Sequence, residues 1–452
     1  MPARRTDRRR RPRPEARRPA PEPRTDGPLL ELGVERIAHG GVAVARHEGR
    51  VVFVADAIPG ERVVARVHDD RHDRFWRADA VEVLDASPDR RPHPWAEAGI
   101  DHDPAERAGG AGFGHIAPAR QRALKAEVLA DAMRRFAELE IDARVRAVPL
   151  TDAGSPADAG IPEAPADSPA EGWRTRVRLH VDAEGRVGPY AARSHRVVPV
   201  TSLPLAVPEL EAIAPLDQRF RGADRVDLVA PSGGDAQFVV HHADDRERGP
   251  RPGIREHVGD REFRLDRDGF WQVHRGAART LTRAVQELVD DALFDPRAAN
   301  LDLYGGVGLL AAALGDRFGE TVRITSVEAD ARATEHAAEN LADWVGARAV
   351  TSRVDRYLAE LAEASAAERA RLADATIVLD PPRQGAGREV VDGIAALRPR
   401  QLVYVACDPV ALARDVGLFR ARGYELAELA AFDLFPDTHH LETVARLTAI
   451  VG

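Results

Sequence analysis

The chain has 452 residues, of which 44% are hydrophobic, and this is enough apolar material for two or three ordinary globular domains. A net charge of −9 and a pI near 6.0 do not mark a general nucleic-acid binder, and no run reaches the roughly 18 apolar residues of a membrane span. With one cysteine the chain can form neither an intrachain disulfide nor a thiolate metal cluster, so we expect a cytoplasmic protein that does not contact membranes.

Residues 1–27 form an arginine- and proline-rich tail. The tail is too polar to bury a core, and we expect it to be disordered. Its arginines can pair weakly with phosphates whatever the nucleotide sequence. A purely solubilising tail is the alternative, because the chain uses arginine almost throughout and Lys125 is its only lysine.

Residues 28–87 contain short β-branched runs separated by Gly-Gly, Glu-Gly and Pro-Gly turn signals; the runs lie at 42–45, 51–54, 63–67 and 80–84. Several short strands at such spacing predict a small β-barrel of the OB kind. Its arginines at positions 46, 50 and 62 can face a polyanion such as RNA. They can equally be the solvated face of a barrel that binds nothing.

Residues 88–270 have a mixed pattern that predicts a central α+β domain. A helix is expected near 119–139, and residues 151–172 are a low-complexity stretch of Ala, Pro, Asp and Ser that predicts a flexible insertion without chemistry. Strands with a turn at Glu184 and Gly185 should follow. The apolar face of the helix is expected to consist of Leu124, Val128, Ala132 and Phe136.

From residue 271 to 452 apolar strand-like runs alternate with helical patterns, including one helical pattern over residues 357–372. This alternation predicts an α/β domain with right-handed crossovers and a mostly parallel sheet, and ligands bind at the carboxyl ends of such strands. The last two runs, 424–436 and 440–450, look like an antiparallel hairpin that closes the domain.

A glycine-rich loop follows the first of these strands, in the sequence LDLYGGVGLL at 301–310. Gly306 and Gly308 let the chain turn tightly and let a ligand approach the backbone. Glu328 ends the next strand about 20 residues later, where a carboxylate can bind both ribose hydroxyls. The loop lacks the third glycine of a dinucleotide fingerprint and the chain lacks a phosphate-loop lysine, so S-adenosylmethionine is favoured over NAD and ATP.

Three further groups stand at strand ends. Asp380 begins the stiff sequence Asp-Pro-Pro-Arg, which can hold a ligand or simply connect two elements. Cys407 ends another strand beside a turn-forming Asp-Pro, and is either a reactive thiol or a small buried hydrophobe. Glu442 follows His439 and His440 in a segment that we expect to be buried, where a carboxyl can be paired structurally or act as a base.

Taken in order, five motifs resemble the RNA uracil-C5 methyltransferases, the family that makes 5-methyluridine in ribosomal and transfer RNA. They are FWQVH, DLYGGVG, DPPRQG, VACDPVALARD and FPDTHHLETV, and the barrel sequence is similar to the TRAM RNA-binding domain of that family. The resemblance covers most of the chain. It implies a Rossmann-like class I methyltransferase domain behind a TRAM barrel and a central α+β domain.

The resemblance also implies residue roles. S-adenosylmethionine should be bound by Gln272, Tyr304, Glu328 and Asp380 together with the glycine loop. The thiolate of Cys407 should add to C6 of uracil, which makes C5 nucleophilic, and Glu442 should then remove the C5 proton. We expect a monomer whose substrate is a ribosomal or transfer RNA.

Several positions depart from the family pattern. Many relatives hold an iron–sulfur cluster through a Cys-Gly-Gly-Cys pair that reads Ala-Gly-Gly-Ala at 108–111 here, so we expect no such cluster. Relatives often have Cys or Ala at Gly305, Asn at Leu309 and Asn at Asp408. We expect Leu309 to remove one polar contact with the cofactor, and the charge of Asp408 to raise the thiol pKa.

Two other functions stay open on these residues. One is an RNA-binding protein with an inactive methyltransferase fold, which the presence of both Cys407 and Glu442 disfavours. The other is a methyltransferase acting on small molecules or on cytosine, which the barrel and Glu442 disfavour.

Overall fold

The computed structural model describes residues 26–150, 160–165, 168–242 and 252–450. The predicted disorder of the tail falls almost wholly outside these described residues, as does the middle of the predicted insertion. The described parts of that insertion, 160–165 and 168–172, contain neither helix nor strand. Within the described chain no helix has the length and apolar character that a membrane span requires.

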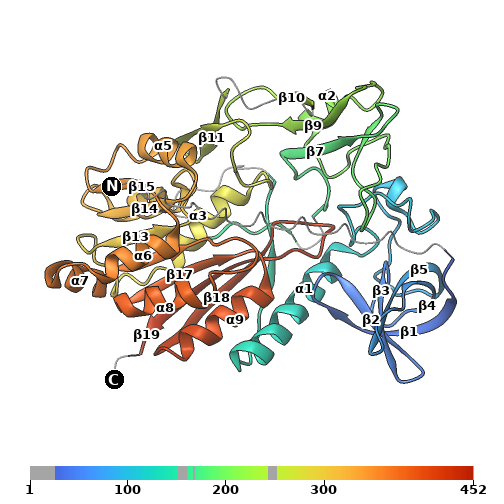
Figure 1. The fold of residues 1–452 in the computed structure, drawn as a ribbon, viewed down its shortest axis with the longest axis horizontal. Coiled ribbons are helices and arrows are strands. Elements are labelled where there is room, and N and C mark those ends of the chain that lie inside the picture. Colours follow the sequence, from blue (N-terminus) through green and yellow to red (C-terminus); the bar gives the residue numbers. More distant parts are fainter. Residues whose placement is uncertain (1–25, 151–159, 166–167, 243–251, 451–452) are drawn as a thin grey trace, which may run out of the picture.

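The N-terminal strands close into the predicted small barrel, which has five strands around an apolar core (Figure 1). One strand, over residues 29–38, was not among the predicted runs, although its buried Leu32 and Val34 alternate with exposed Glu31 and Gly33 as in a half-buried strand. The barrel order is β1-β2-β3-β5-β4. The strands are β1 (Leu29–Ala38), β2 (Val42–His47), β3 (Arg50–Ala55), β4 (Arg62–Asp69) and β5 (Phe75–Asp85).

The middle of the chain forms two small antiparallel sheets. The predicted turn at Glu184 and Gly185 is present, with Gly185 at φ 84° between two paired strands. The first sheet has the order β10-β9-β7-β8, and the second is the hairpin β11-β12. Their elements are β7 (Arg176–Val181), β8 (Val187–Gly188), β9 (Ala223–Val229), β10 (Gln237–His242), β11 (Gly253–Val258), β12 (Arg261–Asp266), the short helix α2 (Pro208–Ile213) and the 3-10 turn Ala96–Ala98.

The C-terminal part is built on an eight-stranded sheet in the order β15-β14-β13-β16-β17-β19-β18-β6. Strands β13 to β17 are parallel to one another, and β18 and β19 form the predicted antiparallel hairpin. The strands are β13 (Asn300–Leu303), β14 (Ile324–Glu328), β15 (Ala347–Thr351), β16 (Thr376–Leu379), β17 (Gln401–Ala406), β18 (Tyr424–Asp433), β19 (Glu442–Ala449) and β6 (Val145–Ala147). The predicted α/β fold is therefore present.

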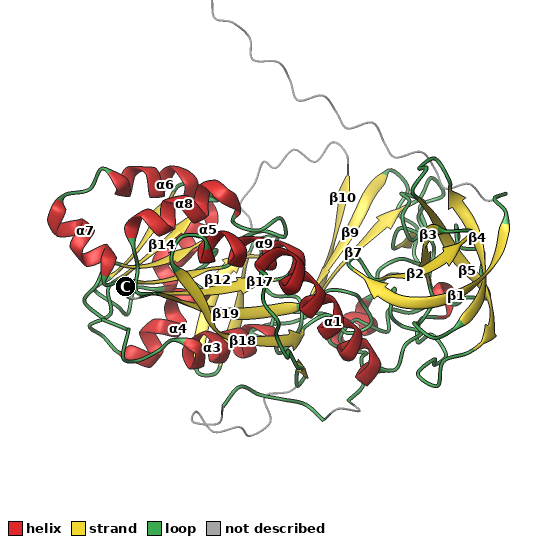
Figure 2. Ribbon diagram, turned by 90° about the horizontal axis from the view of Figure 1, so that it is seen from below, coloured by secondary structure: helices red, strands yellow, loops and turns green. Residues whose placement is uncertain are grey.

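Helices cover both faces of this sheet (Figure 2). Strand residues alternate between the faces, so that Leu402 and Tyr404 pack on one helical layer while Val403 and Val405 pack on the other. The helical segment predicted over 357–372 is two helices, because Ser365 caps a new one by accepting a hydrogen bond from Glu368 N. The helices are α3 (Ala277–Leu288), α4 (Leu309–Phe318), α5 (Ala331–Asn340), α6 (Val354–Ala362), α7 (Ala366–Ala373), α8 (Gly387–Leu397) and α9 (Pro409–Arg420).

Helix α1 (Pro118–Ala132) lies between the barrel and the large sheet, in contact with β1, β6 and α9 (Figures 1 and 2). The prediction that Phe136 lies on its buried face is wrong: the side chain is 46% exposed. The helix ends in a π-helical turn, Met133–Ala137, whose wider spacing rotates the buried face onto Met133 and Ala137. With β6, this helix attaches residues of the predicted central domain to the large C-terminal sheet.

Candidate active site

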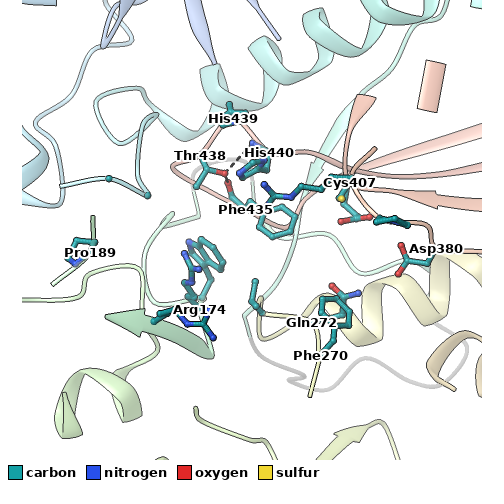
Figure 3. A pocket seen from close by; sticks show the side chains of 18 of the residues that line it. Arg174, Pro189, Phe270, Gln272, Asp380, Cys407, Phe435, Thr438, His439 and His440 are labelled. Atoms are coloured by element: carbon teal, nitrogen blue, oxygen red, sulfur yellow. Dashed lines mark hydrogen bonds between the residues drawn. The ribbon is translucent and has the colours of Figure 1, made fainter. Parts of the chain in front are cut away.

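A cavity of about 1240 Å³ lies at the carboxyl end of the parallel strands. Because β13, β14, β16 and β17 run in the same direction, the residues that follow them reach the same edge of the sheet. Figure 3 shows Asp380 and Cys407 on one side of this pocket, with Arg174 and Pro189 across from them. The predicted site residues that line it are Gln272, Tyr304, Gly306, Glu328, Asp380, Cys407 and Glu442.

The glycine loop between β13 and α4 uses its glycines in different ways. A Cβ at Gly305 would lie 2.0 Å from Ser326 Oγ, so this chain has no room there for the Cys or Ala of relatives. Gly306 has φ 54° and no heavy atom within 4 Å of an added Cβ, which leaves its backbone open to the cavity. Gly308, at φ 92°, starts α4 against Leu341 and does not line the cavity.

Glu328 ties the next strand to this loop. Its Oε2 accepts a hydrogen bond from Gly306 N at 3.1 Å, and its Oε1 accepts from Ala329 N and Asp330 N at 2.6 and 2.8 Å. The carboxylate is thus held at the cavity edge by three backbone amides. Leu309, in contrast, is buried in the apolar cluster behind the loop and does not line the cavity.

Two aspartates beneath the loop have strongly altered acidity. Burial raises the pKa of Asp302 from 3.8 to about 7, although Ser326 Oγ donates a hydrogen bond to it at 3.0 Å. Burial, and then the charge of Asp302, raise the pKa of Asp380 to about 7 as well. Asp380 lines the cavity, and burial together with the charge of the underlying Asp302 disfavours its anion, so this end of the cavity favours a bound positive charge.

Cys407 and Glu442 lie side by side. Ala406 at the end of β17 pairs with Thr443 of the antiparallel strand β19. Cys407 follows Ala406 and Glu442 precedes Thr443, so the two residues lie opposite each other at this end of the strand pair. Burial, followed by the charges of Glu442 and Asp380, raises the pKa of the thiol to about 12. Burial and Asp380 also raise the pKa of Glu442 well above its ordinary value, against the opposing charge of Arg383. The thiol therefore carries its proton at neutral pH, and burial favours the protonated form of Glu442.

The loop before Glu442 supplies another wall, where Thr438 Oγ1 donates to Phe435 O at 2.8 Å (Figure 3). Burial lowers the pKa of His439 to about 4 and that of His440 to about 3, so both imidazoles are neutral. Burial also lowers the pKa of the guanidinium of Arg174, which lines the same cavity. Sequence reasoning missed Arg174, because the segment RTRVR reads only as a strand and its fold-back toward the sheet is not local information.

The expected effect of Asp408 on the thiol is not what the contacts indicate. Its Oδ1 caps α9 by accepting from Val410 N and Ala411 N, and its Oδ2 lies 2.8 Å from His39 Nε2. Burial raises the pKa of Asp408, but these hydrogen bonds outweigh burial and lower it below its ordinary value. The charges that raise the thiol pKa are instead those of Glu442 and Asp380.

The positions of the Cys-Gly-Gly-Cys pair of relatives are apolar here. Ala108 and Ala111 are buried in a cluster with Trp95, and Gly109 N donates a hydrogen bond to Tyr190 O. Among the described residues no group of three or more His, Cys, Asp or Glu side chains is arranged to hold a metal ion.

Comparison with known proteins places this geometry in a family. A family model described as tRNA (uracil-5-)-methyltransferase matches residues 257–450. An uncharacterized RNA methyltransferase of Streptomyces avermitilis is 38% identical, with 93% of this chain and 98% of that protein aligned. The 23S rRNA (uracil(1939)-C(5))-methyltransferase RlmD of Pseudomonas fluorescens is 30% identical, with 94% and 95% aligned.

The fold has a solved counterpart. The crystal structure of Pyrococcus abyssi tRNA (uracil-54, C5)-methyltransferase in complex with S-adenosyl-L-homocysteine superposes with a TM-score of 0.64, over 92% of this chain and 99% of that one. Its sequence identity is 21%, so this likeness concerns the fold. The full-length relatives extend it to function: the chain belongs to the S-adenosylmethionine-dependent RNA uracil-C5 methyltransferases, as its five sequence motifs predict.

Proposed function

We propose that the protein methylates C5 of a uridine in ribosomal or transfer RNA through a covalent bond between Cys407 and C6. The observation that carries this proposal is the adjacency of Cys407 and Glu442 in the cavity that also contains the predicted cofactor residues. A thiol and a carboxyl at one point can act on neighbouring carbons of the same base. A free thiol stays reduced in the cytoplasm, where we propose that the enzyme acts.

Cys407 carries the first half of the reaction. The Cys407 thiol releases its proton to solvent, and its sulfur forms a bond to C6 while the electrons of the C5–C6 double bond move into the uracil as an enolate. S-adenosylmethionine, when bound, supplies a methyl group on a positively charged sulfur. The enolate that Cys407 creates is the nucleophile that would take this methyl group at C5 as the methyl–sulfur bond breaks, with the donor held by Gln272, Tyr304 and Glu328.

Glu442 carries the second half. C5 now bears both the methyl group and its original hydrogen, and the Glu442 carboxylate takes this hydrogen as a proton. The electrons of the C–H bond restore the C5–C6 double bond, and the bond from C6 to Cys407 breaks. Glu442 needs to be ionised for this step. A positive charge bound beside it before methyl transfer would lower the pKa that burial has raised, and the loss of that charge in the transfer would make the carboxylate a stronger base.

The cavity fits the proposed cofactor on its own chemistry. Asp380 and Glu442 line the cavity as carboxyl groups with raised pKa values, and a sulfonium would provide the positive charge that they lack. We propose that Glu328 binds the ribose hydroxyls of the cofactor, and that Gly306 lets the cofactor approach the backbone closely. We assign the remaining contacts to Gln272, Tyr304 and Asp380, with Gly308 shaping the loop.

The RNA class stays open within this proposal. The printed names of the related proteins include enzymes of 23S rRNA and of tRNA. The barrel turn at Gly40 and Gly41 lines the same cavity as the thiol. We propose that the barrel binds RNA next to the target nucleotide, which must leave any base stack before both faces of its ring can be reached.

Covalent trapping tests the proposal. Ribosomal and transfer RNA containing 5-fluorouridine is incubated with the protein and S-adenosylmethionine, and a denaturation-resistant complex is sought. The fluorine cannot leave as a proton, so the adduct with Cys407 should persist, while Cys407→Ser should give none. If no RNA forms an adduct that depends on Cys407, the chain is an RNA-binding protein with an inactive fold. Nucleoside analysis of the product separates 5-methyluridine from 5-methylcytidine.

A further inference from the structure

The turn between the first two barrel strands forms part of the wall around the thiol. Gly40 and Gly41 line the main cavity together with Cys407 and His439. A Cβ at Gly41 would lie 2.5 Å from the Cβ of His439, and Gly41 has φ 75°, so only glycine allows this approach. The barrel is therefore seated directly against the catalytic loops.

One polar contact joins this turn to the residue after the thiol. His39 Nε2 lies 2.8 Å from Asp408 Oδ2, and the other oxygen of Asp408 caps the first turn of α9. The side chains of His39 and Asp408 are 49% and 23% exposed. Asp408 thus fixes where α9 begins, and His39 fixes one oxygen of Asp408.

A second cavity, of about 130 Å³, separates the turn from α1 behind the thiol. It is lined by His39, Lys125, Cys407, Asp408 and His439 among others. The thiol is therefore not held by close packing on this side. Its position depends more strongly on the ends of the loop that carries it, one of which is Asp408.

We propose that His39 is a positioning residue for Cys407: through Asp408 it holds the start of α9, and it thereby connects barrel docking to the approach of the thiol to C6. This inference rests on the proposed function. The charged or titratable groups that act on His39 are Asp408, which raises its pKa by accepting its hydrogen bond, and Arg414, which opposes this. His39 also faces His439, whose imidazole is neutral.

The test measures the first-order rate of adduct formation on 5-fluorouridine RNA, with RNA affinity and cofactor affinity measured separately. His39→Ala should slow the adduct about tenfold, because small displacements of a reacting group cost large factors in rate. RNA and S-adenosylmethionine affinities should not change. His39→Gln, whose amide can donate from nearly the same place, should restore most of the rate.

Two controls separate a positioning role from a general one. His257→Ala removes a histidine of similar exposure, 44%, that faces Glu262 on the β11-β12 hairpin and does not line the cavity, and it should leave the rate unchanged. His39→Ala combined with Asp408→Asn should be no slower than the slower single variant, since both remove one contact.

The outcomes distinguish this inference from the proposed function. If the unaltered protein forms no adduct, the proposed function fails. If it forms the adduct and His39→Ala does so at the same rate, the inference about His39 is wrong while the proposed function stands. Additive effects in the double variant, or a parallel loss of cofactor affinity, would also overturn the inference.

Discussion

Buried carboxyl groups occur in two regions of this molecule and have opposite surroundings. At the junction of the barrel, α1 and the large sheet, each has a cationic partner: Glu61 pairs with Arg90 at 2.6 Å, and Asp433 pairs with Lys125 at 2.6 Å. In the cavity, neither Asp380 nor Glu442 makes a side-chain hydrogen bond or ion pair with any residue of the described chain. A counter-charge favours the ionised form of a buried acid and lets it hold elements together, whereas burial without one favours the protonated form.

This difference separates the acids that pair with cations from Glu442, which we propose as the general base. Burial without a counter-charge costs stability, and proteins retain it mainly where a perturbed pKa is useful. Substitution of an acid in the cavity should therefore change chemistry and leave stability intact. Substitution of a paired group at the junction should lower stability and leave the chemistry intact.

Glu442→Gln should give the largest effect on chemistry. Loss of a general base commonly lowers turnover by about 10² to 10⁴-fold. The adduct between Cys407 and ordinary uridine RNA should accumulate, because proton removal no longer occurs. Thermal unfolding should show no loss of stability, because the amide resembles the protonated acid. Glu428→Gln on the exposed face of β18 is the matched control and should be fully active. If Glu442→Gln were also fully active, Glu442 would not be the general base.

Lys125→Met should give the largest effect on stability. The ammonium and the carboxylate of Asp433 are 1% and 3% exposed, so the variant leaves an uncompensated buried charge. Such a change costs about 3–5 kcal/mol. Urea unfolding measures it, and adding Asp433→Asn should recover part of the loss. The exposed pair of Arg134 with Glu140 provides the comparison: Arg134→Met should cost at most about 1 kcal/mol.

Asp302→Asn tests the contrast between buried acids with and without a cationic partner, through the pH dependence of stability. The folded-state pKa of Asp302 lies near 7, above its ordinary value of 3.8, so the unfolded chain releases this proton first as pH rises. The stability contributed by the protonated acid is therefore lost between about pH 4 and pH 7. The asparagine variant should lose less stability over that interval in denaturant unfolding. An unchanged pH profile would contradict the raised pKa.

Asp79→Asn in the barrel should change the pH dependence of stability in the opposite direction. Burial raises the pKa of Asp79, but His68, Arg193 and Arg107 outweigh burial and bring it below its ordinary value. This acid therefore contributes stability above its unfolded pKa, and the contribution is lost as pH falls through its folded pKa. The variant should be less stable than the unaltered protein at neutral pH, and the difference should shrink in acid.

The sequence identifies the cavity better than the junction, for a physical reason. Glu328, Asp380 and Cys407 each follow an apolar strand, and parallel strands bring their carboxyl ends together whatever the rest of the chain does. No comparable rule pairs Lys125 with Asp433, which are 308 positions apart. The contact of His39 with Asp408 spans 369 positions and depends on where the barrel docks.

The strand β6 was missed for a related reason. It has three residues, and it joins the sheet only because α1 returns the chain to the edge strand β18. The error at the end of α1 is local: a period of 3.6 residues continued to Phe136, whereas the helix widens into a π-turn before it.

Phe136→Gln should give the smallest effect, and it tests that local error directly. A core phenylalanine would lose about 3–5 kcal/mol on truncation, but this side chain is 46% exposed, and exposed substitutions usually change the free energy of unfolding by about 0.5 kcal/mol or less. Met133→Ala, one turn earlier and fully buried, should cost about 2–5 kcal/mol by leaving a cavity between α1 and the large sheet. Urea unfolding of the two variants side by side decides the matter. Equal losses would mean that the regular helical face predicted from sequence continues to Phe136, and that the π-turn does not separate the exposed end of α1 from the core.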